Sequence, residues 1–68
     1  MFFILEMQTT DAGTAFLPIV NCETRREAES TFYYKCASAC QSDIMIHTII
    51  TFLANGEVVS DLTKCFRH

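Results

Sequence analysis

The sequence predicts an α+β domain with elements in the order ββαββ, in which one helix packs on one face of a four-stranded, mainly antiparallel sheet. Three observations predict this fold: strand-like apolar patterns over residues 2–9 and 44–53, a helix-capping motif at Thr24, and an Asn55-Gly56 pair between two strand-like segments. A chain of 68 residues forms a single small domain, which we expect to span residues 1–68.

Residues 2–9 form the first predicted strand, because their side chains alternate after an apolar start. One face carries Phe3, Leu5 and Met7, and the other carries Phe2, Ile4, Glu6 and Gln8. A turn is expected at residues 10–13, which contain Asp and Gly. Residues 14–20 are again strand-like, and Pro18 predicts an edge strand because proline has no N–H for a second neighbour.

A helix is expected from Thr24 to about Gln41, a stretch that contains no Gly or Pro after its start. Thr24 and Glu27 have the spacing of a capping box, in which each side chain accepts a hydrogen bond from the other residue's backbone N–H. Apolar or small residues recur at steps of three and four and define the buried stripe, namely Ala28, Phe32, Cys36, Ala39 and Cys40.

The third predicted strand covers residues 44–53 and is largely apolar on both faces, which is typical of a strand covered on both sides. Asn55-Gly56 predicts a hairpin that leads into a return strand from residue 57 to 62, extending toward Phe66. The same order of elements fits a β-grasp arrangement, in which the first and last strands pair in parallel, and it also fits a plain meander.

One helix covers only one face of such a sheet, so the second apolar face predicts a homodimer or higher oligomer. The alternative is that sheet twist and large side chains close the gap within one chain. We expect the interaction residues on the uncovered face to be Phe2, Ile4, Met45, His47 and Ile49. A second candidate surface is the start of the helix with Arg25, Glu29 and Tyr33, although a solvated helix face is the favoured interpretation of these residues.

Composition excludes several classes of protein. Five Lys and Arg beside eight Asp and Glu, for a net charge of −3, argue against a nucleic-acid binder. The longest apolar run, residues 49–54, is far shorter than the roughly 20 residues that span a membrane, and no secretory leader is recognisable, so we expect a cytoplasmic protein. No phosphate-binding loop, nucleophile elbow or pair of carboxylates at acid–base spacing occurs, and we therefore expect no enzyme.

The four cysteines are expected to be free thiols of a reducing compartment, with a disulfide as the alternative. Cys36 and Cys40 share a helix face, and with His47 they are the weak candidates for a structural zinc site, which would need a further ligand. The simpler interpretation of His47 is a buried side chain bonded to a carbonyl or hydroxyl group. We expect no metal and no cofactor.

Three segments carry a resemblance to short uncharacterised proteins of Firmicute-type bacteria and their phages. They are Phe3-Ile4-Leu5-Glu6-Met7-Gln8-Thr9, Glu27-Ala28-Glu29-Ser30 and His47-Thr48. The resemblance implies a phage or mobile-element origin and a small accessory protein, and it implies no activity or cofactor. The leading hypothesis is a non-enzymatic homo-oligomeric accessory protein, and the alternatives are an inhibitor that docks on a host protein and a zinc-stabilised domain.

Overall fold

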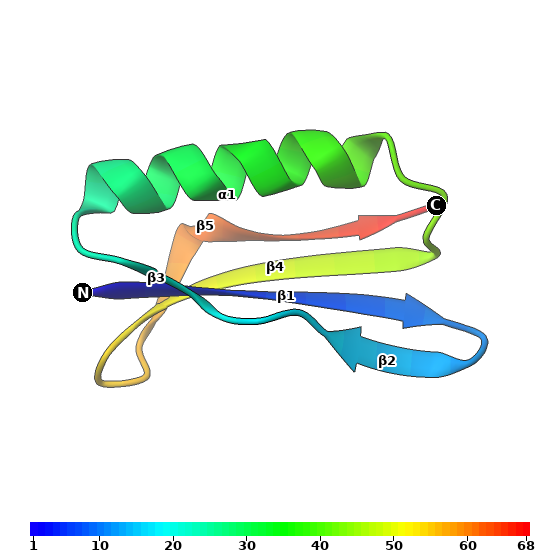
Figure 1. Cartoon of the computed structure of the whole chain (residues 1–68), viewed down its shortest axis with the longest axis horizontal. Coiled ribbons are helices and arrows are strands. Elements are labelled where there is room, and N and C mark those ends of the chain that lie inside the picture. The colour runs from blue at the N-terminus through cyan, green and yellow to red at the C-terminus, as the bar shows by residue number, and fades with distance from the viewer.

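The computed structural model describes residues 1–68 and is built around its first strand (Figure 1). β1 (Phe2–Thr10) pairs with β2 (Gly13–Phe16) and β3 (Val20–Cys22) on one side and with β4 (Ile46–Leu53) on the other. β5 (Val58–Arg67) lies beyond β4, and every pairing is antiparallel. The helix α1 (Arg25–Cys40) lies against this single sheet, so the predicted α+β class is confirmed.

The strand order is neither of the two that we expected. β1 is antiparallel to β4 and does not touch β5, which excludes the parallel pairing of a β-grasp sheet. The order β2-β1-β4-β5 is also not sequential, so the sheet is no meander. β3 and β4 flank β1 and are therefore parallel to each other, and α1 crosses over β1 to connect them.

Pro18 divides the second predicted strand, which raises the strand count from four to five. The backbone N–H of Leu17 still bonds to the carbonyl of Glu6 at 3.0 Å, after which the chain leaves the ladder and returns at Val20. The register changes from Met7 opposite Phe16 to Ile4 opposite Val20, which leaves one extra residue in the outer segment. Because proline cannot donate to a ladder, the interruption falls at the edge of the sheet, as predicted.

The helix begins and ends where the sequence predicts. The Thr24 hydroxyl accepts a hydrogen bond from the Glu27 N–H at 3.2 Å, while the Glu27 carboxylate accepts from the N–H of Glu23, not from that of Thr24. Ala28, Phe32 and Ala39 are buried against the sheet. α1 has 16 residues, and no helix in the structure is long and apolar enough to cross a membrane.

The predicted hairpin at Asn55-Gly56 is confirmed, with a three-residue loop. Gly56 has φ +87° and donates its N–H to the Leu53 carbonyl, and the Leu53 N–H bonds to the Glu57 carbonyl, both at 2.8 Å. These bonds describe a type I turn followed by a left-handed glycine. Only Gly56 has a positive φ in this loop, because φ of Asn55 is not positive.

A bulge in β5 follows the hairpin. Ile50 faces Thr63 whereas Phe52 faces Val58, so residues 59–62 lie opposite the single residue Thr51. The Thr63 hydroxyl closes the bulge, because it donates to the Val59 carbonyl at 3.0 Å and accepts from the Thr51 N–H at 3.3 Å. The bulge brings Leu62 into the core at 1% exposure.

Candidate functional site

The two faces of the sheet differ in what covers them. α1 covers the face that carries Ile4, Ile49 and Leu62, which are almost completely buried together with Cys22 from β3 and Phe32 from the helix. Three polar side chains are also buried on this covered face, namely Glu6, His47 and Thr51. The small core under the helix is therefore partly polar.

Four polar side chains between α1 and the sheet form what we call the polar layer, which consists of Glu6, Gln8 and His47 from the sheet and Lys35 from α1. The Glu6 carboxylate accepts hydrogen bonds from Lys35 Nζ at 3.0 Å and from Gln8 Nε2 at 3.2 Å. His47 Nδ1 lies 3.6 Å from Glu6 Oε2, the oxygen that accepts from Gln8, and this separation is beyond hydrogen-bond distance. Neither ring nitrogen of His47 has a hydrogen-bond partner, contrary to the bonded histidine that we expected.

The opposite face of the sheet is covered by nothing in this chain, and we call it the open face. Its large apolar side chains are only half-buried, and they are Phe3, Leu5, Met7, Ile46, Ile50 and Phe52. Phe16 extends the open face onto β2 with 66% exposure. The rings of Phe3 and Phe52 stack at 5.6 Å between centroids across the β1–β4 pair.

The polar residues of the open face are nearly all uncharged. Thr48 and Cys65 lie opposite each other, and the Thr48 hydroxyl approaches the Cys65 sulfur at 3.5 Å. The register places Arg67 at the end of this face, opposite Ile46. No acidic residue belongs to the paired positions of β1, β4 and β5 on this side.

The placement of the two faces is the reverse of what apolar content predicts for an isolated chain. β1 turns Leu5 and Met7 toward the open face and buries Glu6 under the helix. Burying a carboxylate costs free energy that its partners must offset, whereas exposing apolar side chains forfeits about 25 cal/mol per Å². The fold therefore leaves Leu5 and Met7 on the face that α1 does not cover.

Four predicted interaction residues lie on the covered face, which corrects our assignment. Ile4 and Ile49 are 0% exposed and His47 is 4% exposed, while Phe2 is half-buried and packs on the same core. The reason is the crossover connection between β3 and β4. α1 follows directly after β3, in which Cys22 pairs with Phe2, and it packs on the face of β1 that carries Phe2 and Ile4. Met45 is exposed, and it lies in the segment before β4 rather than in the strand.

The predicted surface at the helix start is exposed as expected. Arg25 forms ion pairs with Glu29, at 4.0 Å, and with Asp61 from the β5 bulge, a partner that the sequence did not indicate. Tyr33 is 59% exposed and its ring contacts the edge of Phe32. Exposed ion pairs such as these contribute about 0–1 kcal/mol, so they hold the bulge near the helix without defining a site.

All four cysteines are free thiols: Cys22 is buried, Cys36 is half-buried, and Cys40 and Cys65 are exposed. Burial raises the pKa of the Cys36 thiol; the positive charge of Lys64 opposes this shift and Cys40 adds to it. No three His, Cys, Asp or Glu side chains lie close enough together to hold a metal ion, so Cys36, Cys40 and His47 are not assembled into a zinc site.

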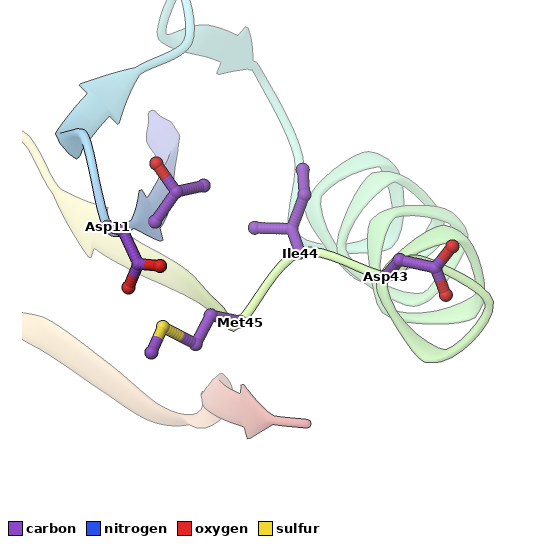
Figure 2. Close-up of a pocket in the computed structure, with 5 residues that line it drawn as sticks. Asp11, Asp43, Ile44 and Met45 are labelled. Carbon is purple, nitrogen blue, oxygen red and sulfur yellow. The ribbon is translucent and has the colours of Figure 1, made fainter.

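A shallow depression of about 490 Å³ lies where the β1–β2 turn meets the segment that leads into β4. It is lined by Thr10, Asp11, Asp43, Ile44 and Met45. Figure 2 shows that Asp11 and Met45 lie on one side, while the Asp43 carboxylate points away from them. Because its polar groups do not converge, the depression lacks the arrangement of a ligand pocket.

Comparison with known proteins adds no family to these observations. The chain matches no protein-family model, and no curated protein or solved structure is significantly similar to it.

Proposed function

We propose that this protein is a small accessory protein that acts by association rather than catalysis, and that two copies join through their open faces. The observation that carries the proposal is the reversed placement of the faces of β1. Leu5 and Met7 lie on the open face, while Glu6 lies under the helix at 7% exposure. A second copy on the open face would bury apolar side chains that the chain leaves to water.

The dimensions of the open face suit a small interface. Four strands about 4.8 Å apart and about seven residues long, at about 3.3 Å per residue, give a projected area of about 450 Å². Two copies would then bury about 900 Å² of projected area, which is close to the ~1,000 Å² of a specific interface. This figure leaves out the extra area of side chains that protrude from the sheet. At about 25 cal/mol per Å² the gross gain is about 20 kcal/mol, from which the costs of association are subtracted.

The chemistry of the open face favours a second copy as the partner. A two-fold contact places the same patch on both sides, so its groups must be compatible with themselves. Uncharged residues such as Phe3, Ile50 and Thr48 meet this condition, and Arg67 lies at the margin. A partner recognised by charge would require ionic groups that this face lacks.

We propose no catalytic role because the titratable groups of the polar layer are buried. The polar layer combines a carboxylate, a lysine and an imidazole, but the side chains of Glu6 and His47 are 9% and 5% exposed and lie beneath α1. Burial of these two side chains leaves little of either group accessible to a substrate. The bacterial or phage origin of the protein rests on the resemblance given above.

The test is the mass of the native protein in solution, measured by native mass spectrometry under reducing conditions. We expect more than one chain per particle. Ile50→Lys places a charge in the open face and is expected to lower the particle mass. The matched control Tyr34→Lys alters a side chain that is 77% exposed on the helix and should leave the mass unchanged. A monomeric parent protein, or equal masses for both variants and the parent, contradicts the proposal.

A further inference from the structure

The free edge of β5 offers a second contact between copies. The sheet ends at β5, and no strand pairs with its outer side. The opposite edge consists of β2 and β3, with four and three residues, and is interrupted at Pro18. In β5 the bulge ends at Leu62, which leaves residues 63–67 as a regular and uncovered edge.

The hydrogen bonding of β5 fixes which groups point outward. His68 donates its N–H to the Met45 carbonyl at 2.9 Å, so this pair is hydrogen-bonded. Because hydrogen-bonded and non-bonded pairs alternate along an antiparallel ladder, residues 64 and 66 also turn their backbone groups toward β4. Thr63, Cys65 and Arg67 therefore present their N–H and C=O groups to solvent.

We propose that β5 pairs antiparallel with β5 of a second copy, with the two-fold axis at Cys65. The inference extends the proposed self-association and rests on it only in taking a second copy as the partner. In this register Cys65 faces the same residue of the other copy, Lys64 faces Phe66, and Thr63 faces Arg67. Each of these residues is part of the regular edge described above.

The side chains favour this register over its neighbours. An axis at Lys64 or at Arg67 would place like charges directly opposite each other, which is destabilising. An axis at Thr63 would run into the bulge, and an axis at Phe66 would place Lys64 opposite His68 instead of opposite a phenyl ring. With the axis at Cys65, Lys64 meets a phenyl ring, the group that it already approaches within its own chain at 5.2 Å from the Phe66 centroid.

The pairing satisfies the whole outward edge. The three outward residues of each copy form hydrogen-bonded pairs, and every N–H and C=O of Thr63, Cys65 and Arg67 gains a partner. The two sheets become continuous, both helices stay on the same side, and the two open faces merge into one. The two-fold axis of the β5 contact is perpendicular to the sheet, whereas the axis of the face-to-face contact lies in the plane of the sheet. The two contacts are therefore compatible, and together they give a tetramer.

Thiol cross-linking tests the register. Opposed residues of a hydrogen-bonded pair have Cα atoms about 5.5 Å apart, a separation that suits a disulfide. The test uses Ile50→Lys as background, so that the open face does not bring the copies together. Diamide then takes one hydrogen from each of two thiols and the sulfurs join. Cys40→Ser, which keeps Cys65, should give a covalent dimer on a non-reducing gel, and Cys65→Ser, which keeps the exposed Cys40, should not.

A backbone variant tests the pairing without cross-linking. Cys65→Pro removes an N–H that points outward, so it spares the bonds of β5 to β4 while breaking the proposed edge. In the otherwise unaltered chain it should halve the particle mass, with the circular dichroism spectrum of the folded protein retained. Equal cross-linking of the Cys40→Ser and Cys65→Ser variants, or an unchanged mass for a folded Cys65→Pro variant, overturns the edge contact. A mass that Ile50→Lys leaves unchanged contradicts the open-face contact instead.

Discussion

Lys35→Met is expected to destabilise the protein because it removes the cation that neutralises Glu6. The Lys35 Nζ atom lies 3.0 Å from Glu6 Oε1, and the side chains are 16% and 9% exposed. Without Lys35, the carboxylate keeps only Gln8 as a hydrogen-bond donor and still lies under α1. A buried charge that loses its partner pays its desolvation cost without compensation.

The size of the effect follows from the burial of the pair. Breaking a buried ion pair on one side costs about 3–5 kcal/mol, and the residual exposure of Lys35 places this pair near the lower figure, about 3 kcal/mol. Domains have about 0.05–0.15 kcal/mol of stability per residue, which gives about 3–10 kcal/mol for 68 residues. The variant would therefore lose about three tenths or more of the folding free energy, and its Tm would fall by about 12–24 °C.

Urea unfolding followed by circular dichroism, at one fixed protein concentration, measures this loss. Glu6→Leu combined with Lys35→Met removes both charges and should return the free energy of unfolding to the parent value or above it. Lys64→Met is the matched control, because this exposed lysine forms no ion pair and lies 5.2 Å from the centroid of the Phe66 ring, so its removal should cost about 0.5–1 kcal/mol. A Lys35→Met variant as stable as the control, or a double variant no more stable than Lys35→Met, would refute a desolvated pair.

Two further predictions concern the bulge and the helix thiols. Thr63→Val removes the hydroxyl that bonds to the Val59 carbonyl and the Thr51 N–H, and it should lower the free energy of unfolding in urea by about 1–3 kcal/mol, whereas Thr63→Ser should restore most of it. Because burial raises the pKa of Cys36, less thiolate forms there at a given pH, and iodoacetamide should label Cys36 more slowly than the exposed Cys40. The labelling rate of Cys36 should rise with pH through the alkaline range. Equal labelling rates for the two cysteines, measured by peptide mass spectrometry, would contradict the burial of Cys36.

The elements that local chemistry determines could be predicted from the sequence. Thr24 and Glu27 marked the helix start because a capping hydroxyl and the third residue after it interact within one turn. Asn55-Gly56 marked the hairpin because Gly56 supplies the positive φ that the loop needs. Pro18 placed its strand at an edge, but the sequence did not show that the strand would divide there, since this depends on where β1 offers its partners.

The strand order and the covered face could not be predicted, because both depend on contacts between distant segments. Alternation shows that Leu5 and Glu6 lie on opposite faces, but it does not show which face meets the helix. Crossovers between parallel strands are right-handed in about 98% of cases, so the strand order selects the covered face whatever its apolar content. Our assignment of Ile4 and Ile49 to an interface failed for this reason, and Asp61 was missed because the bulge that brings it to Arg25 has no local signal.

The central position of β1 also has a consequence for synthesis of the chain. β2 and β3 follow β1 closely and pair with one of its edges, but β4, which pairs with the other, begins 36 residues after Thr10. At about 5–20 residues per second, that second edge waits about 2–7 s for its partner on the ribosome. During this interval an unpaired strand edge that carries Phe3 and Met7 is available to any neighbouring chain. Pairing with a neighbouring chain therefore competes with native pairing until β4 has been made.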